Sequence, residues 1–107
     1  MLLAIPLFGP RVSPRFDHAQ RLMLATLEKG RVTSREEILL EPLAGWQRVE
    51  KLIDLGVNIV ICGGIDKESA CRLNEYHIRV IPLVSGEAIR VLRDFKAGKI
   101  APPSDRR

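Results

Sequence analysis

The chain has 107 residues, of which 46% are hydrophobic, and its formal net charge is +4. This length fits one domain with one hydrophobic core, without the support of metals or disulfides. The two cysteines, Cys62 and Cys71, are nine positions apart and form no CxxC pair, which excludes a disulfide framework and a zinc finger. We predict a single domain over residues 1–100, followed by a flexible tail over residues 101–107.

Charge and hydropathy also limit the partners and the location. Apolar runs are too short to cross a membrane, and the N-terminus lacks the basic region and cleavage site of a signal peptide. Neither a run of like charges nor a set of stacking aromatic residues indicates a nucleic-acid surface. We therefore predict a cytoplasmic protein that binds neither membranes nor nucleic acid.

The first 40 residues have the pattern of three strands. Leu2 to Phe8 is apolar on both faces, although Pro6 cannot donate a ladder hydrogen bond and could mark the place where pairing ends. Residues 9–19 have the composition of a loop. Residues 20–27 and 32–40 then predict a hairpin around a tight turn at Gly30, and the polar middle of its second strand is typical of a sheet edge.

The rest of the chain alternates helices and strands. Helices are predicted over residues 43–55, 67–75 and 86–97, and strands over residues 57–62 and 78–83. In the first helix Trp46 and Val49 recur at helical spacing on the buried side, with Arg48 outward. Ser85 is the expected cap of the last helix, in which Ile89 belongs to the buried stripe.

This order of elements predicts a three-layer α/β/α fold around a mixed five-stranded sheet. Right-handed crossovers make the first, fourth and fifth strands parallel. The hairpin strand beside the first strand runs antiparallel to it.

The stretch from Val57 to Asp66 is the centre of this pattern. A strand covered on both faces is followed directly by Gly63 and Gly64, and then by Asp66 as a helix N-cap. Ligands of α/β sheets bind at such carboxyl ends of strands, where glycines let backbone N–H groups approach. The same residues also fit a tight connection that binds no ligand.

Several short motifs resemble the dinitrogenase iron–molybdenum cofactor biosynthesis family, which includes NifX-like carriers and the C-terminal domain of NifB-like proteins. The motifs are Ala4-Ile5-Pro6, Val12-Ser13-Pro14-x-Phe16, Glu41-Pro42, Gly63-Gly64-Ile65, His77-Ile78-Arg79-Val80 and Ala97-Gly98-Lys99-Ile100. They cover residues 2–100 in order. The chain departs from the family at Asp17 and Asp66, where glycine is frequent. It also departs at Leu43-Ala44-Gly45-Trp46, a loop in which the family often carries a histidine near a glycine.

The resemblance implies a ribonuclease H-like fold with strand order 3-2-1-4-5 and strand 2 antiparallel. It also implies a non-catalytic carrier that binds an iron–sulfur or iron–molybdenum cluster precursor, as in nitrogen fixation, and that meets cofactor-assembly proteins. Ribonuclease H-like nucleases need several converging carboxylates, whereas only Asp17 and Asp66 lie near the expected crevice, so we expect no enzymatic activity.

The candidate site residues lie in the loop after the first strand and in the glycine turn. His18 and Cys62 are the candidate metal ligands, because iron clusters are held by imidazole and thiolate groups. Arg11 and Arg15 would attract an anionic cluster, and Gly63 and Gly64 would offer backbone donors. Cys62 could equally be a small core residue, and His18 a surface residue.

A second functional class stays open. The same loop and turn would suit a small regulatory or interaction module that binds an anionic metabolite or a protein partner. Bound iron and acid-labile sulfide after anaerobic purification would separate the two classes.

Overall fold

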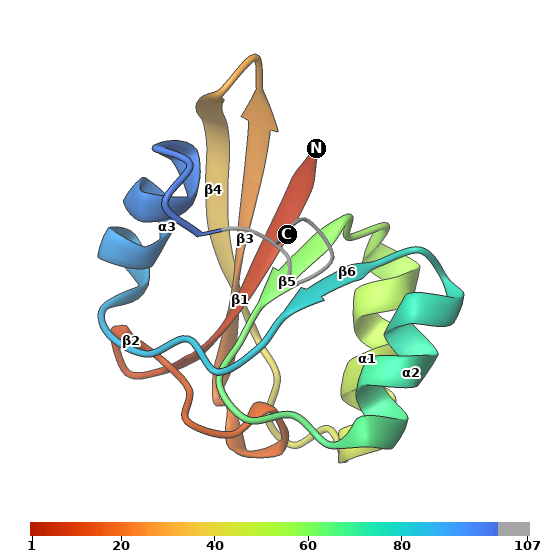
Figure 1. The fold of residues 1–107 in the computed structure, drawn as a ribbon. Helices are drawn as coiled ribbons and strands as arrows, with labels where there is room; N and C mark the ends of the chain where they lie inside the picture. Colours follow the sequence, from red (N-terminus) through yellow and green to blue (C-terminus); the bar gives the residue numbers. More distant parts are fainter. Residues whose placement is uncertain (101–107) are drawn as a thin grey trace.

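The computed structural model describes residues 1–100, in which a mixed sheet lies between helices (Figure 1). The tail predicted over residues 101–107 lies outside the described residues. The strands are β1 (Leu2–Phe8), β2 (Arg11–Val12), β3 (Arg21–Glu28), β4 (Arg31–Leu39), β5 (Ile59–Ile61) and β6 (Arg79–Ile81). The helices are α1 (Gly45–Leu55), α2 (Lys67–Glu75), α3 (Ala88–Lys96) and a short 3₁₀ helix η1 (Phe16–His18).

The strand order is β4-β3-β1-β5-β6, with β5 parallel to β1 and β6, and β3 antiparallel to β1 and β4. This is the order that the family resemblance implies. The sheet has six strands rather than the predicted five, because β2 pairs antiparallel with the end of β1. The sequence prediction of a plain loop over residues 9–19 was therefore wrong, since this segment contains both β2 and η1.

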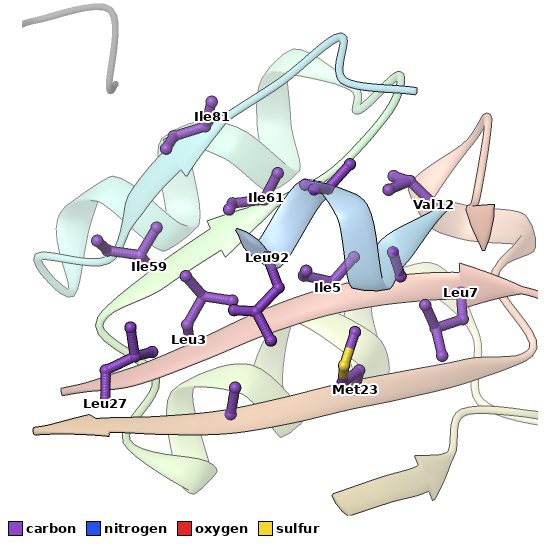
Figure 2. Packing of buried hydrophobic residues seen from close by; sticks show 13 residues of the cluster. Leu3, Ile5, Leu7, Val12, Met23, Leu27, Ile59, Ile61, Ile81 and Leu92 are labelled. Atoms are coloured by element: carbon purple, nitrogen blue, oxygen red, sulfur yellow. The ribbon is translucent and has the colours of Figure 1, made fainter. Parts of the chain in front are cut away.

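The helices form the two outer layers, with α3 on one face of the sheet and α1 and α2 on the other (Figure 1). Alternation along β1 divides its side chains between two cores. Leu3, Ile5 and Leu7 pack against α3, as Figure 2 shows, whereas Ala4 belongs to the core under α1 and α2. The two cores confirm the three-layer α/β/α prediction.

Pro6 is compatible with its place inside a central strand. Its carbonyl oxygen accepts a hydrogen bond from the Ser13 N–H at 2.9 Å. Both backbone groups of a strand residue point the same way, so the missing N–H faces the β5 side rather than β3. The last β1 residue paired with β5 is Ala4, and no ladder bond is therefore lost at Pro6.

The predicted hairpin is confirmed, with β3 and β4 joined at Lys29 and Gly30. Both turn residues have positive φ, 52° and 77°, which suits a two-residue turn between twisted strands. The pairing register shifts between Thr26 and Leu27, where β4 carries one additional residue, Thr33. This bulge adds twist to the hairpin, which extends beyond the rest of the sheet (Figure 1).

The predicted helix α2 is confirmed to the residue, while the other two helices are shorter than expected. Asp66 caps α2 and accepts a hydrogen bond from the Ser69 N–H at 2.9 Å, as predicted. Gly56 ends α1 with φ of 75°, also as predicted. The N-cap of α3 is Glu87 and not Ser85, and its side chain makes no capping hydrogen bond.

Three assignments to helix faces were wrong. Trp46 is 71% exposed, whereas Arg48, expected to face outward, is only 5% exposed. In α3 Ile89 is exposed and Val91 occupies the core in its place. Arg48 is buried because its guanidinium reaches carbonyl groups that are distant in sequence, which helical spacing does not show. None of the described helices has the length and apolar character needed to cross a membrane.

Candidate functional site

The loop after β2 and the glycine turn after β5 meet at the carboxyl edge of the sheet, as predicted. The Gly64 N–H donates to the Pro14 carbonyl at 2.7 Å, and the Phe16 N–H donates to the Gly64 carbonyl at 2.8 Å. Arg15 and Gly64 form a parallel bridge. The Gly64 N–H is thus occupied within the fold, and the prediction that it stays free for a ligand was wrong.

Gly63 permits this close approach of the two segments. A Cβ atom built at Gly63 would lie 2.7 Å from the Pro14 carbonyl oxygen and would overlap the Ser13 carbonyl oxygen. Any side chain would therefore push the 13–16 loop away from the sheet. The structure gives Gly63 a packing role, in which it holds the loop beside the sheet edge.

Arg48 fixes the far end of the same loop. Its Nε donates to the Leu43 carbonyl at 2.9 Å, and its Nη1 donates to the carbonyls of Phe16, at 3.3 Å, and Ala19. Phe16 and Ala19 lie on either side of Asp17 and His18, so this buried guanidinium clamps η1 at both ends. Helical spacing had placed Arg48 in solvent, and no local signal marks it as the partner of carbonyls more than 28 residues away in sequence.

The clamped segment presents His18 and Arg15 to solvent, with side chains 62% and 63% exposed. Asp17 lies between them, where its carboxylate accepts hydrogen bonds from Arg15 at 2.9 and 3.2 Å. The His18 Nε2 lies 3.9 Å from the same carboxylate. Arg15 and His18 line one hollow of about 160 Å³, together with Phe8, Ser13 and Pro14. The imidazole, the guanidinium and an aromatic ring are therefore adjacent and accessible.

Cys62 does not take part in this hollow. Its side chain is fully buried in the core under α1 and α2, and burial raises the pKa of the thiol to about 12. A thiol in this state is not available as a thiolate at neutral pH. The other cysteine, Cys71, is exposed on α2.

Arg11 lies outside the hollow as well. It is exposed on β2, opposite Phe8, and forms an isolated bridge with Glu87. Across residues 1–100 no group of three or more His, Cys, Asp or Glu side chains is arranged to hold a metal ion. The structure therefore brings together His18 and Arg15 alone from the predicted set, supported by the backbone of Gly63 and Gly64.

A larger hollow of about 460 Å³ lies between α1 and α2 and reaches η1 at Asp17. Its lining residues are Asp17, Gly45, Trp46, Val49, Glu50, Asp66, Glu68, Ser69 and Arg72. Arg72, the only cation in this lining, is paired with Glu50 at 3.2 Å. The excess of carboxylates disfavours an anionic ligand here.

The sequence did not indicate this hollow. Asp17 and Asp66 were the only acids expected near the crevice, whereas the packing of α1 against α2 adds Glu50 and Glu68. The exposed ring of Trp46 in its lining was also unforeseen, because the helical pattern placed that residue in the core.

Comparison with known proteins places the chain in a family. The sequence profile of the dinitrogenase iron–molybdenum cofactor family matches residues 1–98. The chain belongs to this family. Comparison with curated protein sequences gave no match.

Solved structures have the same fold. The protein PH0822 aligns over 98% of this chain and 96% of its own, with 24% identity and a TM-score of 0.88. The apo form of the orange protein from Desulfovibrio gigas aligns over 96% of this chain and 92% of its own, with 18% identity and a TM-score of 0.80. A NifB-like protein from Thermotoga aligns over 99% and 96%, with 21% identity and a TM-score of 0.73. These identities support a common fold.

Proposed function

We propose that this member of the dinitrogenase iron–molybdenum cofactor family is a non-catalytic carrier of an anionic iron–sulfur or iron–molybdenum cluster precursor. The observation that carries the proposal is the hollow in which His18 and Arg15 stand exposed beside Phe8. Imidazole nitrogen is a suitable ligand for iron, and a guanidinium offers several donors to an anion. The family name points to the same class of cargo.

The loop is pre-organised for this role. Arg48 and the backbone of Gly64 hold the segment around His18 in place, so little conformational entropy is lost when a cargo binds. One imidazole in an open hollow provides sparse ligation, which suits a protein that must release its cargo. We leave Cys62 out of this ligand set, because its thiol is buried and protonated at neutral pH.

The non-catalytic assignment is part of the proposal. We infer a ribonuclease H-like fold from the order β4-β3-β1-β5-β6 with β3 antiparallel. Nucleases of that fold use carboxylates that converge on metal ions, and β1 carries no acidic residue.

A regulatory or interaction module is the second candidate, favoured by exposed apolar residues at the same edge. Trp46 is 71% exposed and Leu83 is 83% exposed, and both would suit a protein partner. Such a module would bind its partner or an anionic metabolite without retaining iron.

The test is anaerobic incubation of the purified protein with ferrous iron and sulfide, followed by gel filtration and analysis of retained iron and acid-labile sulfide. Wild type should retain a cluster, and His18→Ala and Arg15→Gln should retain much less while keeping the native fold. His77→Asn is the matched control, because His77 is also exposed but lies outside the hollow at φ of 62°, which asparagine tolerates. Equal cluster retention by His18→Ala and wild type would show that the hollow does not hold the cluster. The absence of retained iron in every protein would favour the regulatory or interaction module.

A further inference from the structure

The edge of the sheet at β4 is open in the described part of the chain, since β4 pairs only with β3 (Figure 1). The direction of its free backbone groups follows from the ladder. The Asn58 N–H donates to the Leu2 carbonyl at 2.8 Å, so the backbone N–H and C=O groups of Leu2 point toward β5. The backbone groups of successive β1 residues then point alternately toward β5 and toward β3. The same alternation continues through the residue pairs that join β1 to β3 and β3 to β4. As a result, the N–H and C=O groups of Arg35 and Glu37 point to the open edge of β4.

The side chains of these two residues share one face of the sheet. Arg35 lies opposite Ala25 and Glu37 lies opposite Met23, and both partners belong to the core under α3. Glu36, between them, lies on the other face. The open edge therefore presents a cation and an anion, two positions apart, on the α3 side, and the exposed Glu37 carboxylate also lies 3.8 Å from the Arg21 Nε of the same chain.

A basic hollow adjoins Arg35. It has a volume of about 200 Å³ and lies between β4 and α3. Its lining residues are Val32, Arg35, Ile89, Leu92, Arg93 and Lys96. The three cations of this lining have no acid among them, and the ion pairs found within residues 1–100 involve none of the three. Converging cations of this kind favour an anionic group brought by another molecule.

We propose that this edge pairs with the same edge of a second copy of the chain, antiparallel and around a two-fold axis at Glu36. In this register Arg35 lies opposite Glu37 of the second copy, and Glu37 lies opposite its Arg35. Each such pair exchanges both backbone hydrogen bonds, because these residues face the open edge. The incoming carboxylate of Glu37 also lies at the mouth of the basic hollow, near Arg93 and Lys96.

Charge selects this register. A symmetric antiparallel pair must place one residue opposite itself. An axis at Arg35 opposes two arginines, an axis at Glu37 opposes two glutamates, and an axis at Ser34 places the bulged Thr33 opposite Arg35. Only the axis at Glu36 forms opposite-charge pairs at the positions that exchange hydrogen bonds.

The pairing has a cost that keeps it weak. The two Glu36 side chains lie opposite each other on the face of the sheet away from α3 and repel. A contact made by single strands is also small compared with the interfaces of stable dimers. The dimer is therefore reversible and depends on protein concentration, and the charges of β4 select one pairing while opposing aggregation.

Sedimentation velocity of wild type, Arg35→Glu and Glu37→Arg over a concentration series tests the proposal. Each single variant opposes like charges in its own homodimer, so its dimerisation should be at least about tenfold weaker than that of wild type. An equimolar mixture of the two variants restores opposite charges at both pairs, and it should dimerise about as well as wild type. Circular dichroism confirms that each variant is folded.

Two further measurements use nearly unperturbed protein. Glu36→Gln removes the central repulsion and should tighten the dimer several-fold. Amide hydrogen exchange at Arg35 and Glu37 should slow as wild-type concentration rises, whereas exchange at exposed Thr33 changes less. A monomer at about 1 mM, single variants that dimerise like wild type, or a mixture no better than its components would each overturn the proposal.

Discussion

Replacing Arg48 by methionine removes the donors of the loop clamp while keeping most of the buried volume. The carbonyls of Leu43, Phe16 and Ala19 then lose the guanidinium, which contacts all three at present. Hydrogen bonds from a charged donor contribute about 1.5–3 kcal/mol each, and an unsatisfied buried acceptor costs about 1–3 kcal/mol. Part of this loss is offset because methionine no longer requires burial of a charge.

The net expectation is a loss of about 3 kcal/mol in the free energy of unfolding. This corresponds to a fall in Tm of more than about 10 °C for a domain of this size. Urea unfolding followed by circular dichroism measures the loss, with Lys51→Met as the control, because Lys51 is exposed on the same helix. The control should stay within about 0.5 kcal/mol of wild type.

The structural damage in Arg48→Met should appear in η1. Amide resonances of residues 16–19 should shift or broaden in Arg48→Met, because the clamp holds both ends of η1. A stability within about 0.5 kcal/mol of wild type, with these resonances unchanged, would refute the role given to Arg48.

Other predictions follow from single contacts. Gly63→Ala should destabilise by about 2 kcal/mol or more, since its Cβ would strike the Pro14 carbonyl, whereas Gly45→Ala, which meets nothing within 4 Å, should not destabilise; urea unfolding compares the two. Asp66→Ala should cost about 1 kcal/mol at neutral pH through the lost N-cap. The hydrogen bonds from Ser69 lower the pKa of Asp66 in the folded state. The contribution of Asp66 to stability is therefore present above its unfolded-state pKa and is lost as pH falls through its folded-state pKa. The free energies of unfolding of wild type and Asp66→Ala should converge in acid. Maleimide labelling of the native protein should modify Cys71 rapidly and Cys62 only after unfolding, because burial raises the Cys62 pKa to about 12; rapid labelling of both would contradict that burial.

The sequence was sufficient for the architecture because the elements carry local signals. Gly30 and Gly56 mark the hairpin turn and the end of α1, and both have positive φ in the structure. Asp66 begins α2 as its composition predicts. Strand β2 gave no such signal, because two residues pair there through contacts with distant parts of the chain, such as the Val12 N–H bond to the Gly86 carbonyl.

The site was less predictable for a related reason. Sequence order brought His18 and Gly64 to one edge, which only required parallel strands. It could not show that Gly64 donates to Pro14, nor that Arg48 finds its carbonyl partners in the loop. Cys62 illustrates the same limit, because a strand residue at the end of an apolar run can point to a crevice or into a core, and here it points into the core.

We propose above all that the hollow beside His18 holds an anionic metal cluster. The most direct measurement is anaerobic reconstitution of wild type, His18→Ala and Cys62→Ser with ferrous iron and sulfide, with retained iron and acid-labile sulfide determined for each. We expect wild type and Cys62→Ser to retain a cluster and His18→Ala to lose most of it. Retention that is unchanged in His18→Ala, or lost in a folded Cys62→Ser, would contradict it.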